Sequence, residues 1–173
     1  MGSWGITALE SDNGLDTVGI IREYAADGTT DLKEILSALK QDELAAPPAG
    51  QGVCHSGIEA LAEVILKYLG KTVGDLDYAH EDVKFSPVSS FTAEKEDIRW
   101  IREYLLETLN SAERKTEIRW GGWLRQADWN AWRERMQTLI DTMDTLIAIP
   151  SDSIELQNKW LEECEEMGEM EMR

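Results

Sequence analysis

The sequence has few cysteines, few prolines and no long apolar run. Cys54 and Cys164 are the only two cysteines, and the chain has no Cys-x-x-Cys pair, so we expect reduced thiols and neither a disulfide framework nor a cysteine-based metal site. No stretch approaches the roughly 20 apolar residues needed to cross a bilayer. The N-terminus also lacks a basic segment followed by a hydrophobic one. We therefore expect a cytoplasmic protein that does not associate with membranes.

The common sequence signatures of enzymes and of cofactor-binding sites are also missing. The chain has no hydrolase nucleophile elbow, phosphate-binding loop, dinucleotide-binding fingerprint or metalloprotease helix. We therefore expect no cofactor and no metal, and we assign no catalytic residue. Because an unfamiliar enzyme can lack every one of these motifs, an enzyme remains an alternative to a non-catalytic protein.

Basic residues are scarce compared with acidic ones. The chain has 17 lysines and arginines against 34 aspartates and glutamates, which gives a formal net charge of −17. Phosphate contacts need a cationic face, so direct nucleic-acid binding is not expected. A basic protein is the kind of partner that this charge favours.

The 173 residues and 42% hydrophobic content are typical of one folded domain. Apolar residues recur every three to four positions along most of the chain, as in Leu32, Ile35, Leu36 and Leu39. We therefore predict an all-α fold, a compact single-domain array of about six helices. An N-terminal half, residues 1–91, is expected to pack against a tryptophan-rich helical half, residues 92–173.

Polar capping residues mark the expected helix starts, because their side chains satisfy free backbone N–H groups. Ser56 and Glu59 form a capping box before an apolar helix, and Gly121-Gly122 predicts a break. The helix that follows carries an apolar seam, and Pro150 ends it. The other expected capping residues are Ser11 or Asp12, Thr30, Thr92, Asp128, and Asp152 with Glu155.

The N-terminus resembles an uncharacterised bacterial family, the domain of unknown function 4259. The resemblance lies in Met1-Gly2-Ser3-Trp4-Gly5, in the segment from Leu9 to Asp16 with its Glu10-Ser11-Asp12-Asn13 run, and in the helix from Ile58 to Ile65. It covers roughly the first 70 residues. It departs from the family at Gly14 and does not extend into the tryptophan-rich half. The resemblance implies a bacterial, helical, cytoplasmic protein, and it implies no activity.

The segment from Ala112 to Arg135 is basic and rich in tryptophan. It holds six basic residues against four acidic ones, a net charge of +2 in a chain of −17. Arginine and tryptophan are enriched where interfaces carry most of their energy. We therefore select Arg119, Trp120, Trp123 and Arg125 as candidate partner-binding residues. The alternative is that Trp129 and Trp132 belong to the core and that the arginines pair with the chain's own acids.

Two further groups of residues are candidates for binding a ligand or an ion. Glu10, Asp12 and Asp16 surround the expected start of the first helix, where carboxylates can bind a cation or simply interact with the helix dipole. His55 follows Cys54 just before a capped helix, where a thiol pKa can fall, although no catalytic signature surrounds the pair. His80 lacks a suitably spaced second metal ligand, so we expect it in a surface loop.

These observations predict a non-catalytic acidic module that binds a basic protein, of the immunity-protein, antitoxin or nucleic-acid-mimic type. One alternative is an enzyme or small-ligand binder with a pocket at the Trp/Arg segment. The other is a structural homo-oligomer formed through exposed tryptophans.

Overall fold

The computed structural model describes residues 5–24, 29–69 and 90–157. These residues form five α-helices, two short 3-10 helices and a three-stranded sheet. The α-helices are α1 (Asp12–Tyr24), α2 (Leu32–Lys40), α3 (Gly57–Tyr68), α4 (Lys95–Arg114) and α5 (Gln126–Ile147). The other elements are β1 (Thr29–Asp31), η1 (Ala49–Gln51), β2 (Ser90–Glu94), η3 (Arg119–Gly122) and β3 (Ser153–Gln157).

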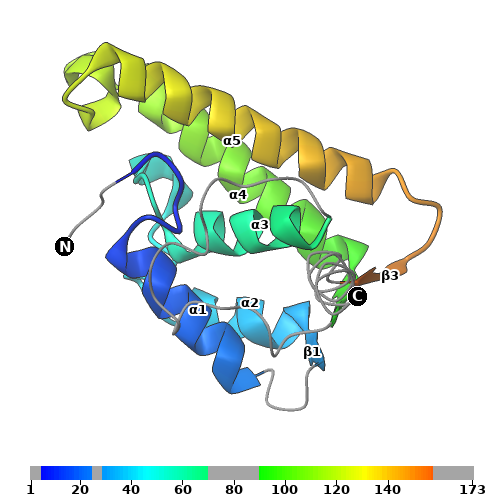
Figure 1. Cartoon of the computed structure of the whole chain (residues 1–173). Coiled ribbons are helices and arrows are strands. Elements are labelled where there is room, and N and C mark those ends of the chain that lie inside the picture. Colours follow the sequence, from blue (N-terminus) through cyan, green and yellow to red (C-terminus); the bar gives the residue numbers. More distant parts are fainter. Residues whose placement is uncertain (1–4, 25–28, 70–89, 158–173) are drawn as a thin grey trace, which may run out of the picture.

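Helix α3 lies at the centre of the fold, with α1 and α2 on one side and α4 and α5 on the other (Figure 1). Each of its 12 residues is buried, as expected for a helix with apolar residues on more than one face. The capping box is confirmed in a shifted form. The Ser56 hydroxyl accepts a hydrogen bond from the backbone N–H of Glu59, while the Glu59 carboxylate accepts one from the N–H of His55 rather than of Ser56.

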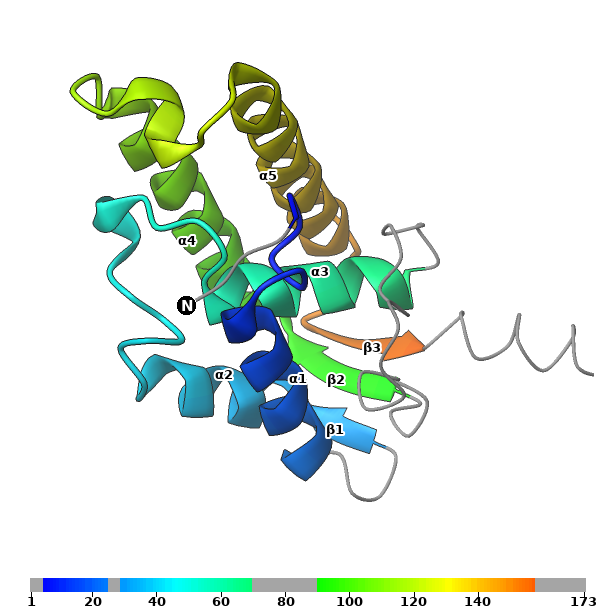
Figure 2. The same cartoon turned by 60° about the vertical axis from the view of Figure 1, so that its left-hand side comes forward.

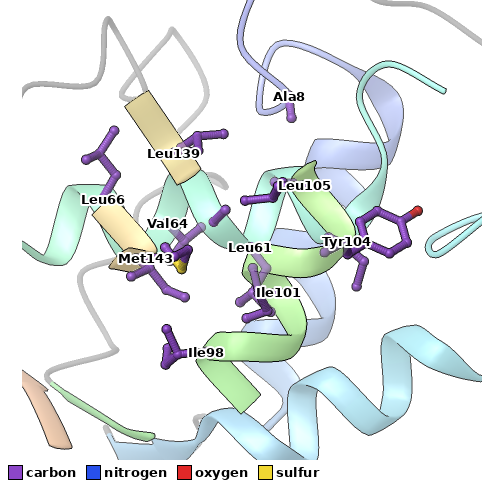
Figure 3. Packing of buried hydrophobic residues seen from close by; sticks show 14 of the residues in the cluster. Ala8, Leu61, Val64, Leu66, Ile98, Ile101, Tyr104, Leu105, Leu139 and Met143 are labelled. Carbon is purple, nitrogen blue, oxygen red and sulfur yellow. The ribbon is translucent and has the colours of Figure 1, made fainter. Parts of the chain in front are cut away.

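Helices α4 and α5 form a long antiparallel hairpin, whose connecting segment projects beyond the rest of the molecule (Figures 1 and 2). The seam predicted for α5 is confirmed, because Trp132, Met136, Leu139, Met143 and Leu146 are all buried. Figure 3 shows where this seam meets its neighbours: side chains of α3, α4 and α5 converge in one hydrophobic cluster. The hairpin is therefore anchored along its shaft.

The all-α prediction is only partly correct, because the three strands form a small sheet in the order β1-β2-β3. Strand β2 pairs with β1 in parallel, with Thr30 opposite Phe91, and with β3 in antiparallel fashion, with Phe91 opposite Leu156. In β2 and β3 the apolar side chains alternate: Phe91, Ala93, Ile154 and Leu156 are buried. Such short alternations are ambiguous in a sequence otherwise dominated by helical spacing.

Several predicted helix starts are wrong because the residues expected to cap a helix belong to strands of this sheet. Thr30 and Thr92 lie in strands, and Asp31 caps α2 by accepting a hydrogen bond from the N–H of Lys33. Glu155 lies in β3, so no helix starts at Asp152.

Helix α5 begins at Gln126 without a side-chain cap, and Asp128 lies within its first turn. Ser11 does cap α1, through a hydrogen bond from the N–H of Gly14.

The sequence predictions for residues 70–89 and 158–173, including His80 and Cys164, lie outside the described residues. None of the described helices is both long enough and apolar enough to cross a membrane.

Candidate functional site: a groove at the tip of the α4–α5 hairpin

Three consecutive residues of the hairpin tip, which spans residues 115–125, have positive φ angles, a conformation that favours glycine. Gly121 and Gly122 have φ values of 60° and 94°, and Trp120 has 53°. A Cβ atom on Gly121 would lie 2.3 Å from Cζ3 of Trp129, so the tip packs directly against the start of α5. The helix break predicted at Gly121-Gly122 is thus confirmed.

The tip exposes apolar side chains. Leu124 is 91% exposed and Ile118 is 49% exposed. Trp120 and Trp123 are half-buried, as is Trp129, whereas Trp132 is in the core and stacks on Trp129 with ring centroids 5.5 Å apart. The alternative to partner binding is therefore confirmed for Trp132, which lies in the core. It is also confirmed for four arginines of the segment that pair with the chain's own acids: Arg114, Arg125, Arg133 and Arg135. Trp120 and Trp123 are half-buried and keep exposed surface.

A groove runs between the tip and the N-terminal segment that precedes α1. We call it the tip groove. It has a volume of about 530 Å³. Its lining residues are Gly5, Ile6, Glu10, Gly122, Trp123, Leu124, Arg125 and Asp128.

The groove brings together three of the residues selected from the sequence, Glu10, Trp123 and Arg125. The other selected residues are not part of its lining. Arg119 lies over the ring of Trp120, 4.2 Å from its centroid, and Asp12 and Asp16 are exposed on α1. Glu10 is therefore the acid from the first helix start that faces the tip.

The two carboxylates of the groove differ in their partners. Both oxygens of Asp128 accept hydrogen bonds from Arg125, at 2.9 and 3.0 Å. Glu10 accepts a hydrogen bond from the hydroxyl of Thr7 at 3.0 Å and forms no ion pair within the described ranges. Its carboxylate also rests against Gly5, where a Cβ atom would lie 1.2 Å from Oε2. Glu10 is thus fixed in place, and no described residue provides a direct counter-ion for its charge.

His55 contacts both walls of the tip groove, the N-terminal segment through Gly5 and the hairpin tip through Trp123. Its Nε2 lies 2.9 Å from the carbonyl oxygen of Gly5, and its ring packs edge-to-face on Trp123, with centroids 5.4 Å apart. Burial lowers the pKa of His55, and the Gly5 carbonyl opposes that shift. The imidazole is therefore neutral at pH 7 and donates its Nε2 proton to Gly5. This residue is a structural junction with a φ of 63°.

Glu59 and Glu63 are buried carboxyl groups of α3, and Arg135, whose side chain is 20% exposed, connects α5 to α3 through Glu63. Arg135 donates two hydrogen bonds to Glu63, at 2.8 and 2.5 Å. Burial raises the pKa of Glu63, and the hydrogen bonds from Arg135 oppose that shift. Burial also raises the pKa of Glu59 to about 8, and its Oε1 has no hydrogen-bond partner in the described part of the chain.

Glu59 and Glu63 were not predicted from the sequence to be buried carboxyl groups. The signal was present, because both acids fall within the apolar stretch from Ile58 to Ile65 and lie four positions apart, which places them on one helix face. Leu124 was not selected from the sequence either, since a single leucine in a polar connector has no periodic pattern around it.

Cys54 is not an activated nucleophile in this fold. Burial, with a smaller contribution from Glu59, raises the pKa of its thiol to about 12, so the thiolate is rare at neutral pH. His55 uses its ring for Gly5 and Trp123 rather than for the thiol. Among the described residues, no group of three histidine, cysteine or acidic side chains is placed to hold a metal ion.

A second concavity, of about 540 Å³, lies between α2, α4 and residues 46–51. Trp100 and Tyr104 stack there with centroids 5.5 Å apart. The ammonium group of Lys40 already lies 3.9 Å from the centroid of Trp100, so a side chain of the protein itself occupies this aromatic face. The tip groove is therefore the better candidate site.

Comparisons with family models, with curated proteins and with solved structures found no match to this chain. The resemblance to the domain of unknown function 4259 stays a prediction based on the residues quoted above.

Proposed function

We propose that this protein is a non-catalytic binding module that docks onto a basic protein through the α4–α5 hairpin tip. Immunity proteins, antitoxins and nucleic-acid mimics are functions of this type. The observation that carries the proposal is Leu124, a leucine that is 91% exposed and stands between Trp123 and Arg125 beside the tip groove. Tryptophan and arginine, the residues on either side of Leu124, are enriched among energetically dominant interface residues, and an exposed leucine between them gains free energy when a partner removes it from water.

The position of the tip supports this proposal. The shaft of the hairpin is fixed by α3, whereas the tip projects from the body (Figure 2). A partner can therefore reach Leu124 and Ile118 without any rearrangement of the core. Burying the Leu124 side chain would contribute about 1.5–3 kcal/mol to association.

The charge of the chain supports a basic partner over an acidic one. The net charge of −17 attracts a cationic protein at long range and makes the association rate sensitive to salt. Locally, Arg125 is neutralised by Asp128, so the basic composition of the tip does not repel such a partner at the groove.

The test is a capture experiment with Leu124→Ser and a matched control. Leu44 is also an exposed leucine, at 70%, but it lies in the turn after α2, away from the groove. We expect wild type and Leu44→Ser to retain one or more proteins of high isoelectric point from a lysate of the native host at low salt. Leu124→Ser should lose them, and wild type should lose them as salt is raised. Equal capture by all three chains contradicts the proposal.

A second candidate is small-ligand binding in the tip groove, which the groove's volume of about 530 Å³ favours, since ligand pockets span roughly 300–1,000 Å³. A metabolite that protects the groove residues from hydrogen exchange in the absence of any protein would favour this candidate. The homo-oligomer alternative has a separate test. Light scattering over a concentration series would show self-association of wild type, and that association would have to weaken in Leu124→Ser.

A further inference from the structure

We infer that the tip groove recognises the guanidinium group of an arginine side chain on the partner. This inference rests on the proposed function and adds the residue type that the groove selects. The two carboxylates of the groove differ in whether they have a counter-ion. Asp128 is neutralised by Arg125 through two hydrogen bonds, and Glu10 has no direct counter-ion within the described ranges. The groove therefore presents one uncompensated negative charge, and a cation is its complementary ligand.

Among the residues that the structure describes, no cation takes this place. Arg135 is close enough for Glu10 to influence its pKa, but its guanidinium is committed to Glu63 by two hydrogen bonds. Arg125, which lines the groove, points its guanidinium at Asp128. Using either arginine for Glu10 would leave Glu63 or Asp128 without its partner, and Glu63 is fully buried. An external cation can pair with Glu10 without that loss.

The aromatic wall favours a planar cation. The indole nitrogen of Trp123 is buried and Trp123 lines the groove, so any part of its ring that a ligand in the groove meets is carbon. Such a surface cannot recognise a ligand by hydrogen bonding, but it can stack against a guanidinium. Because His55 packs against this indole edge-to-face, the ring is held before a ligand arrives.

The carboxylate wall is also set in advance. Thr7 donates its hydroxyl proton to Oε1 of Glu10, and the other oxygen lies over Gly5, which has no side chain to displace it. A fixed carboxylate reduces the ordering entropy lost on binding, and the lone pairs that Thr7 and Gly5 leave free can accept a charge-assisted hydrogen bond from a guanidinium. A lysine ammonium would not gain the planar stacking on the indole.

The probe for the experiment is Nα-acetyl-arginine amide, and its neutral isostere, Nα-acetyl-citrulline amide, is the matched control. We would follow the indole N–H of Trp123 and the backbone N–H groups of Glu10 and Gly122 by ¹H–¹⁵N NMR in low salt. The arginine amide should give saturable shifts confined to the groove. The citrulline amide should give none. Equal shifts with citrulline or with the lysine analogue would overturn guanidinium recognition.

The variant that tests the carboxylate is Glu10→Gln, with the exposed Asp16→Asn as a control that removes a charge outside the groove. We expect the Kd of the arginine amide to rise about tenfold or more in Glu10→Gln, and to stay near the wild-type value in Asp16→Asn. Circular dichroism spectra that match wild type establish that both variants are folded.

The same variants separate this inference from the proposed function. If Glu10→Gln captures the basic partner as well as wild type does, the arginine inference is wrong and the binding function stands. If the arginine amide binds wild type but no basic protein is captured, the proposed function is wrong and the groove's selectivity stands.

Discussion

Arg135 of α5 donates two hydrogen bonds to Glu63 of α3, and the Glu63 side chain is only 1% exposed. The pair links α5 of the hairpin to the central helix α3. An acid placed so deeply keeps its charge only because of this guanidinium, since burial by itself favours the neutral carboxyl.

Breaking this pair should destabilise the protein strongly. Arg135→Met leaves Glu63 without its partner, and we expect the free energy of unfolding to fall by about 3–5 kcal/mol. The double variant Glu63→Leu/Arg135→Met should recover most of that loss, because it also removes the charge that needs a partner. Urea unfolding at pH 7 measures both effects.

The control for that experiment is the exposed pair between Lys33 and Glu94, 3.8 Å apart with side chains 60% and 55% exposed. Lys33→Ala should lower the stability by less than about 1 kcal/mol. A loss of the same small size in Arg135→Met would show that the buried pair is not the link we describe.

Glu59 should make stability fall as the pH rises. Its pKa is about 8 in the folded protein, against a usual value of 4.5, so the folded state keeps a proton that the unfolded state has released. The contribution of this group is complete below pH 4.5 and is lost progressively up to about pH 8, by at most about 1.4 kcal/mol per pH unit. Glu59→Gln imitates the protonated form and removes this dependence.

The measurement is the free energy of unfolding of wild type and Glu59→Gln between pH 4 and pH 9. The stability of Glu59→Gln relative to wild type should rise with pH. A difference for Glu59→Gln that is independent of pH would mean that folding does not raise the pKa of Glu59.

Gly121 should be intolerant of a side chain. In Gly121→Ala the new methyl group would meet the indole of Trp129 at 2.3 Å, and alanine is strained at a φ of 60°. We expect a loss of about 1–3 kcal/mol, measured as a lower Tm, together with a change in tryptophan fluorescence as the tip moves.

A matched glycine lies on α1. Gly19 is exposed, helical and has nothing within 4 Å of a built Cβ, so Gly19→Ala should raise stability by about 0.5–1 kcal/mol. The opposite signs of the two substitutions separate the packing at the tip from a general effect of replacing glycine.

Cys54 should react slowly with alkylating reagents. The shift of its pKa from 9.0 to about 12 lowers the thiolate fraction at pH 7.5 by about a thousandfold relative to a free thiol. Iodoacetamide labelling followed by peptide mapping measures the rate at Cys54 itself, and labelling in urea provides the unperturbed rate. Fast labelling of the folded protein would reopen the catalytic interpretation of Cys54 and His55.

Long helical patterns were predictable from the sequence and short strands were not. The apolar stripe of α2, the Ser56 cap of α3 and the seam of α5 each recur over several turns, so their spacing identifies them. Strands β2 and β3 each bury only two apolar side chains. Two alternating residues beside a capping residue suit a helix start equally well, and only pairing between distant segments decides between the two.

The same distinction applies to the site. Trp123 and Arg125 could be selected because a basic, tryptophan-rich segment stands out from an acidic chain. The contact of the tip with Glu10 and His55 depends on how the hairpin lies across the N-terminal segment, which local spacing does not encode. That neither Arg125 nor Arg135 pairs with Glu10 likewise follows from the partners that these two arginines have in the fold.

The parallel pairing of β1 with β2 has a kinetic consequence. The Thr92 hydroxyl donates to the carbonyl of Thr30 across 62 positions of sequence, so a long loop must close before this edge of the sheet forms. Helices α2 and α3 depend on local contacts, so they can form before that loop closes. We expect the slowest step of refolding to be the arrival of β1 at the sheet, with its amides the last to gain protection from exchange.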